Sequence, residues 1–166
     1  MAASYKHPEP LPITSPRLWF RYGMRSLARV VPPSPMKNHF LRWSGISIGT
    51  GAFIGDSVIF IDGFRDGLIH VEARAVVSPG SCIIAMAYPE QSVLANDRTL
   101  AREAPVTIGA DAWVGSLAVV MPGVEIGACA VLGANSTATR SIPTGEVWAG
   151  SPARHIRDID MTGADD

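Results

Sequence analysis

The sequence has few cysteines and no long apolar run. Only Cys82 and Cys129 occur among 166 residues, and their spacing matches no Cys-x-x-Cys motif. We therefore expect reduced, partly buried thiols rather than a disulfide framework or a metal site. No segment approaches the roughly 18 apolar residues that span a bilayer. The first ten residues are polar and no apolar stretch follows them, so we expect no signal peptide and a cytoplasmic protein.

Charge is also sparse, and it is unevenly placed. Charged residues make up 17% of the chain and hydrophobic residues 47%, which is typical of a globular protein of one domain. The net charge is −1, yet residues 1–47 hold seven basic residues against Glu9 alone, a charge of +6, so that residues 48–166 carry −7. This division predicts two segments with different surroundings. No nucleic-acid-binding motif accompanies the basic segment, so we expect no nucleic acid partner.

Apolar residues recur every six positions along most of the chain. Two insertions interrupt the period, one of five residues at about 65–69 and one of nineteen at about 89–107. The repeating apolar position is occupied by Ile48, Ile54, Phe60, Val71, Val77, Ile83, Ile108, Val114, Val120, Ile126, Leu132 and Ala138. Most residues four places later are small, and glycine follows the apolar position at Gly49, Gly55, Gly109, Gly115, Gly127 and Gly133.

A period of six fits neither an α-helix nor a sheet of long alternating strands. It fits very short strands joined by sharp bends, which we expect the repeated glycines to ease by accepting positive φ. Three such sides close a triangular coil of eighteen residues, and stacked coils supply each other's backbone hydrogen bonds. The pattern predicts an all-β fold over residues 46–143, a parallel β-helix of about four coils. These are residues 48–65, 71–88, 108–125 and 126–143. The external loop at 89–107 is long enough to predict a functional role.

The two ends of the chain lie outside this repeat. In residues 1–45 we expect a helix from Leu18 to Val31, which begins after Pro16 and ends before Pro32-Pro33, and a second helix over 35–43. A basic stripe, defined by Arg17, Arg21, Arg25 and Arg29 at four-residue spacing, is interpreted either as a solvated helix face or as a weak contact with a membrane surface or an anionic carrier. Residues 144–166 form a C-terminal segment with an acidic tail.

Three segments resemble the hexapeptide-repeat acyltransferases, specifically the branch that contains the xenobiotic, sugar and maltose O-acetyltransferases. They are IGADAWVGSLAVVMPGVEIGACAVLGANSTATRSIPTGEVWAGSPARHIR at 108–157, FIDGFRDGLIHVEARAVVSPGS at 60–81 and RWSGISIG at 42–49. The resemblance covers residues 45–157 and implies a left-handed β-helix. It also implies a homotrimer with active sites in clefts between adjacent prisms. The co-substrate would be acetyl-CoA or another acyl-CoA, with no metal, and the acceptor a hydroxyl or amine of a sugar or glycan precursor.

Matching positions imply a binding path for the acyl-CoA. Trp113 would line the channel near the reacting end. The residues implied along the pantetheine arm are Ala134, Thr137 and Arg140. Arg154 and Arg157 would meet the phosphates at the adenosine end, which suits guanidinium groups because they pair with phosphate oxygens in a fixed fork geometry.

The histidine that this family uses as general base is missing. Histidine suits that role because its ordinary pKa lies close to working pH, but its position is occupied here by Met86 or Tyr88, and no histidine lies between Val71 and Arg154. A tyrosine, with an ordinary pKa of about 10, is a poor base unless that pKa is strongly depressed. Tyr88 could nevertheless orient an acceptor.

Four other side chains are candidates for the general base or for holding the acceptor. His70 begins the coil that should carry the base. Asp62 matches a family position that holds the acceptor or its base. Glu90 and Glu103 flank the long loop and offer carboxylates for acceptor hydroxyls or for base work.

Two functions are alternatives to an active acyltransferase. A catalytically weakened relative would still bind acyl-CoA or a sugar, or would act as a scaffold. A γ-type carbonic anhydrase on the same prism would need three zinc-binding histidines, and the stretch without histidine argues against it.

Overall fold

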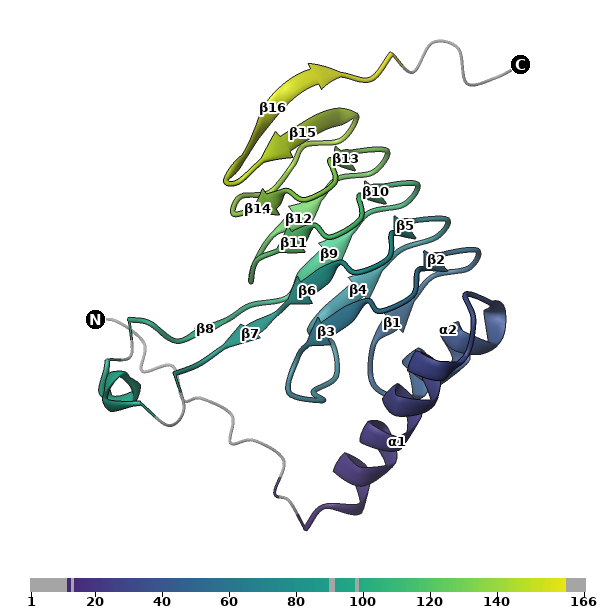
Figure 1. Ribbon diagram of the computed structural model, residues 1–166, viewed down its shortest axis with the longest axis vertical. Coiled ribbons are helices and arrows are strands. Elements are labelled where there is room, and N and C mark those ends of the chain that lie inside the picture. Colours follow the sequence, from purple (N-terminus) through teal and green to yellow (C-terminus); the bar gives the residue numbers. More distant parts are fainter. Residues whose placement is uncertain (1–11, 13, 90–91, 98, 161–166) are drawn as a thin grey trace.

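The computed structural model describes residues 12, 14–89, 92–97 and 99–160, so that Glu9 and Glu90 lie outside the described part of the chain. Short parallel strands form three sheets, in the orders β1-β4-β9-β12, β2-β5-β10-β13 and β3-β6-β11-β14. The chain crosses the three sheets in turn, and successive crossings stack on one another from the helices at one end to a hairpin at the other (Figure 1). This is the parallel β-helix that the six-residue period predicts.

The strands are only two or three residues long. In chain order they are β1 (Ser47–Ile48), β2 (Phe53–Ile54), β3 (Ile59–Ile61), β4 (Ile69–Val71), β5 (Val76–Val77), β6 (Cys82–Ile84), β9 (Val106–Ile108), β10 (Trp113–Val114), β11 (Val119–Val120), β12 (Glu125–Ile126), β13 (Val131–Leu132) and β14 (Thr137–Ala138).

All twelve residues of the repeating apolar position are buried, as expected, with Phe60 the most exposed at 8%. Nine of the twelve smaller residues four places later are buried too, but Val58, Phe64 and Ala87 are only half-buried. Val58 directly precedes β3, Phe64 lies in the insertion after β3, and Ala87 lies in the long insertion after β6. The core is therefore continuous except at the two insertions.

The repeated glycines serve a different purpose from the one expected. None of the six has a positive φ; the left-handed positions include Ser57, Arg74 and Leu117 instead. A Cβ on Gly49 would lie 2.4 Å from the backbone nitrogen of Ala73 in the next coil. These glycines are needed because adjacent coils approach too closely for a side chain, so the expectation that they supply positive φ was wrong.

Two helices cover the N-terminal end of the stack (Figure 1). They are α1 (Pro16–Val30) and α2 (Pro35–Trp43), within two residues of the predicted bounds. The interpretation of the basic stripe as a solvated face is wrong for half of it, because the Arg21 and Arg25 side chains are buried against the coils. Neither helix of the described residues has the length and apolar character that crossing a membrane requires.

The insertions and the C-terminal segment are more regular than predicted. The long loop is an antiparallel hairpin of β7 (Met86–Ala87) and β8 (Arg102–Glu103), with a 3-10 turn η1 (Val93–Asn96) between them. We refer to residues 86–103 as the arm. The shorter insertion ends earlier than expected, since Ile69 is a buried part of β4. Beyond the coils, β15 (Glu146–Gly150) pairs with β13 and folds back on β16 (Ala153–Asp158).

Candidate functional site

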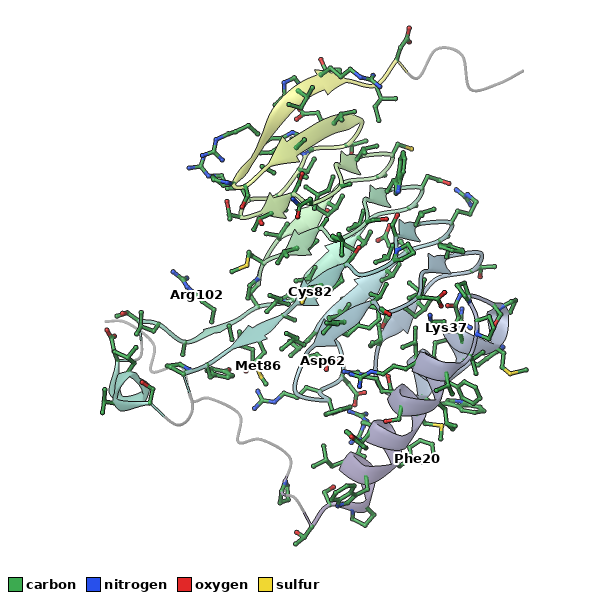
Figure 2. All side chains as sticks on the ribbon, in the orientation of Figure 1. Phe20, Lys37, Asp62, Cys82, Met86 and Arg102 are labelled. Atoms are coloured by element: carbon green, nitrogen blue, oxygen red, sulfur yellow. The ribbon has the colours of Figure 1, made fainter. Side chains whose placement is uncertain are left out.

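The arm places Met86 and Tyr88, the two residues that could occupy the position of the family's histidine, beside the Glu103 carboxylate. It leaves the prism directly after β6, and its ladder pairs Met86 with Glu103 and Ala87 with Arg102. Met86 and Arg102 lie on opposite sides of the hairpin in Figure 2, with Met86 on the side of Asp62. Glu103 is thus directly across the ladder from Met86.

Glu103 is the centre of a half-enclosed polar cluster. Its Oε2 accepts a hydrogen bond from Arg65 Nη1 at 2.6 Å and a shorter one from the Tyr88 hydroxyl. The Glu103 side chain is only 6% exposed and that of Arg65 15%. Arg65 comes from the loop after β3, so the cluster ties the root of the arm to the first coil. The structure therefore brings Tyr88 and Glu103, two of the predicted site residues, into direct contact.

Asp62 faces a helix. Its carboxylate is 1% exposed and accepts hydrogen bonds from the Arg25 guanidinium at 2.6 and 2.9 Å and from the backbone N–H of Phe64 at 3.0 Å. The Arg25 guanidinium also lies 4.5 Å from the centre of the Phe64 ring. Asp62 is therefore occupied in holding α1 against the coil stack.

His70 lies on a different sheet from the arm. It is half-buried on β4, between Ser47 and Thr107 of the neighbouring strands, and its Nε2 is 3.0 Å from the Gly67 carbonyl oxygen. It lines a cavity of about 660 Å³ together with Arg42 and Glu72. The structure does not bring His70 to Tyr88 or Glu103 within one chain.

The residues implied for acyl-CoA occupy the C-terminal half of the stack. Trp113 is 52% exposed on β10, and its indole N–H donates to Ser78 Oγ at 2.9 Å. Thr137 lies on β14, and its hydroxyl accepts a hydrogen bond from Ser151 at 3.1 Å, which links β14 to the turn before β16. Ala134 is exposed in the turn before β14.

The three arginines of this set are all exposed. Arg140 follows β14, whereas Arg154 and Arg157 lie on β16. Arg154 and Arg157 each donate to a backbone carbonyl of their own strand, at 2.9 and 3.0 Å. Neither forms an ion pair with a described residue, so both guanidinium groups are available to an anion.

Among the titratable groups with shifted pKa values, Asp66 and Cys82 illustrate two physical causes. A hydrogen bond from Arg21 holds the pKa of the Asp66 carboxyl below its ordinary value, although desolvation opposes this. Burial raises the pKa of the Cys82 thiol. Both cysteines are free and half-buried, as expected. Among the described residues, Glu146, His155 and Asp158 are the group close enough to hold a metal, and His155 and Asp158 lie exposed on the C-terminal hairpin.

Sequence reasoning missed Arg25 and Arg65, the cations that hold the two acidic site residues. A signal was present in the charge division between residues 1–47 and the rest. The ion pairs Arg21–Asp66, Arg25–Asp62 and Lys37–Asp56 now account for part of it. What the sequence did not reveal was which arginine meets which acid.

Comparisons with known proteins agree with this architecture. A family model described as the bacterial transferase hexapeptide, six repeats, matches residues 105–140. The galactoside O-acetyltransferase of Escherichia coli K12 is 31% identical over 121 residues, which cover 73% of this chain and 58% of that protein. A putative acetyltransferase of Saccharomyces cerevisiae is 31% identical over 116 residues, covering 70% of this chain and 57% of its own length. The chain thus spans less than two thirds of these curated relatives.

Solved structures share the fold at low sequence identity. A hexapeptide-repeat acetyltransferase from Vibrio cholerae in complex with acetyl coenzyme A superimposes with a TM-score of 0.74 at 18% identity, covering 93% of this chain and 94% of that one. A galactoside acetyltransferase in complex with coenzyme A gives a TM-score of 0.63 at 23% identity, covering 87% and 81%. Such neighbours imply that the coil is left-handed.

The period, the stacked triangular coils and these matches define a hexapeptide-repeat protein with the left-handed β-helical fold. Within that class, the chain is similar to a galactoside O-acetyltransferase, at 31% identity over 121 residues.

Proposed function

We propose that this protein is an acyl-CoA-dependent acyltransferase that acetylates a hydroxyl or amine of a sugar or glycan precursor. The observation that carries the proposal is the set of exposed residues on the C-terminal coils, above all the guanidinium groups of Arg154 and Arg157, which form no ion pair with a described residue. Coenzyme A carries several phosphates, which arginines bind through charge-assisted hydrogen bonds. The 31% identity to a galactoside O-acetyltransferase supports both the acetyl donor and the sugar acceptor.

The proposed path of the acyl-CoA runs along the coil stack toward the arm. Arg154, Arg157 and Arg140 meet the phosphates. The pantetheine arm passes Ala134 and Thr137. Trp113, which lies on the sheet of β10, lines the reacting end of the channel from the neighbouring prism. Thr137, Val119, Cys82 and Ile59 stand side by side on the outer face of one sheet, and the arm leaves that same sheet directly after β6. This face therefore connects the arginine end to the arm.

The proposed assembly is a homotrimer in which neighbouring prisms form the clefts. A trimer would bring the arm of one chain beside the outer face of another. The free cysteines support a reducing compartment such as the cytoplasm. A contact with a membrane surface would use the exposed apolar residues of α1, which include Trp19, Phe20 and Val30, because two arginines of the basic stripe point inward.

The test is acetyl transfer from acetyl-CoA to a panel of amino and hydroxy sugars, followed by release of the free thiol. Binding is measured in parallel by thermal shift, since a ligand that prefers the native state must raise its stability. Replacing Arg154 by alanine should weaken CoA binding about tenfold or more, because a hydrogen bond to a charged group contributes about 1.5–3 kcal/mol. Arg29→Ala is the matched control, since Arg29 is exposed on α1, at the opposite end of the coil stack from β16 (Figure 1).

A second candidate function is a scaffold that binds acyl-CoA or a sugar without turnover. The missing histidine favours it. Tight CoA binding without acetylation of any acceptor would support the scaffold and contradict the enzyme.

A further inference from the structure

The hydrogen bonds that described residues donate to Glu103 use one of its two carboxylate oxygens. Both hydrogen bonds to this side chain, from Arg65 and from Tyr88, reach Oε2. Oε1 accepts no hydrogen bond from the part of the chain that the structure describes. No fully buried side-chain oxygen or nitrogen among the described residues lacks a hydrogen-bond partner. Oε1 must therefore be accessible to solvent. A carboxylate in this state is held rigidly and remains able to take up a proton.

Through Tyr88, this carboxylate can receive a proton from a group that does not itself contact Glu103. A tyrosine hydroxyl has one proton to donate and lone pairs that can accept another hydrogen bond. The Tyr88 proton points to Glu103, so the phenol oxygen can accept a hydrogen bond from a second molecule. A phenol whose proton can pass to an adjacent carboxylate can take up a proton without first becoming a phenolate.

We propose that Tyr88 and Glu103 together take the proton from the acceptor hydroxyl or amine, an inference that rests on the proposed acyl transfer. The acceptor proton moves to the Tyr88 oxygen as the Tyr88 proton moves to Glu103. The acceptor oxygen or nitrogen forms a bond to the thioester carbonyl carbon, and the carbon–sulfur bond then breaks. The proton returns from Glu103 through Tyr88 to the departing thiolate, so that free coenzyme A leaves and both residues recover their starting states.

Each partner in the cluster has a separate task. Tyr88 touches the acceptor and is the catalytic residue. Glu103 acts through Tyr88 and is a positioning residue that also stores the proton. Arg65 Nη1, 2.6 Å away, holds the Glu103 carboxylate in place beside the Tyr88 hydroxyl.

The other acids and bases are less well placed for this task. Asp62 is 1% exposed and has both oxygens bound by Arg25. His70 lies on the sheet of β4, and the arm leaves from the sheet of β6. The Tyr88–Glu103 pair stands at the root of the arm, where the outer face proposed for the acyl-CoA ends.

The test compares Tyr88→Phe, Glu103→Gln and the double variant in steady-state transfer from acetyl-CoA to the best acceptor of the sugar panel. Each single variant should lower kcat by at least about 10²-fold, the usual contribution of a general base. The KM for acetyl-CoA should stay unchanged. The double variant should be no slower than the slower single variant, because residues that act as a unit do not give additive losses. Glu103→Asp should restore part of the activity, and the acid limb of the pH–kcat profile should disappear in Glu103→Gln.

Tyr22→Phe is the matched control, because Tyr22 is 52% exposed on α1, and it should keep full activity. Full kcat in Glu103→Gln, or losses that multiply in the double variant, would overturn the relay. So would a hundredfold loss in His70→Ala beside an active Glu103→Gln. Melting temperatures of all variants exclude unfolding, and Glu103→Asp retains the ion pair with Arg65 should Glu103→Gln prove unstable. Absence of product from the unaltered protein would overturn the proposed function itself, which is a separate result.

Discussion

The ion pair of Arg25 with Asp62 is almost wholly withdrawn from water, with side-chain exposures of 6% and 1%. Removing one partner of such a pair leaves an uncompensated buried charge, which costs about 3–5 kcal/mol. We predict that Asp62→Ala lowers the free energy of unfolding by this amount, measured by urea denaturation. Asp56→Ala is the control, since Asp56 is 66% exposed beside Lys37, and should cost less than about 1 kcal/mol. Equal losses in the two variants would show that the Arg25–Asp62 pair is not a structural contact.

At the scale of elements, the contact between α1 and the loop after β3 depends on pH. Arg17 and Arg21 both reach Asp66, whose carboxyl has a lowered pKa chiefly because of Arg21. A carboxyl with a lowered folded-state pKa stabilises the fold fully above its unfolded pKa, about 4, and loses this effect as the pH falls through the folded-state value. Asp66→Asn should therefore cost about 1 kcal/mol or less at pH 7, since Asp66 is 55% exposed. Thermal unfolding should show this difference shrinking below pH 4, and a constant difference down to pH 2 would contradict it.

The same scale shows what could be predicted from the sequence and why. The twelve apolar positions and both helices were predictable because each depends on a local period and on local start and stop signals. The arm was predicted only as a loop, since the Met86–Glu103 pairing depends on register across sixteen intervening residues that carry no period. The burial of Arg21 and Arg25 against the coils could not be predicted from the sequence either. A stripe of arginines looks the same whether it faces water or acids more than thirty residues away.

At the scale of the whole molecule, the prism leaves large apolar side chains uncovered. Trp113, Leu117, Phe53 and Ile59 are between 44% and 63% exposed on the outside of the coils, and exposed apolar surface of this kind is typical of an interface. We predict a particle of three chains by light scattering coupled to size exclusion. A clean monomer at micromolar concentration would contradict both the trimer and the shared clefts.

The most direct test of the central claim follows the acetyl group itself. The protein is given acetyl-CoA labelled in the acetyl group together with the panel of amino and hydroxy sugars, and the products are identified by mass spectrometry. If the protein is an acyl-CoA-dependent acyltransferase, the label appears on one acceptor in step with release of free coenzyme A, and more slowly in Arg154→Ala at limiting acetyl-CoA. If the label stays on coenzyme A, or appears only as free acetate, the protein is not the proposed acyltransferase.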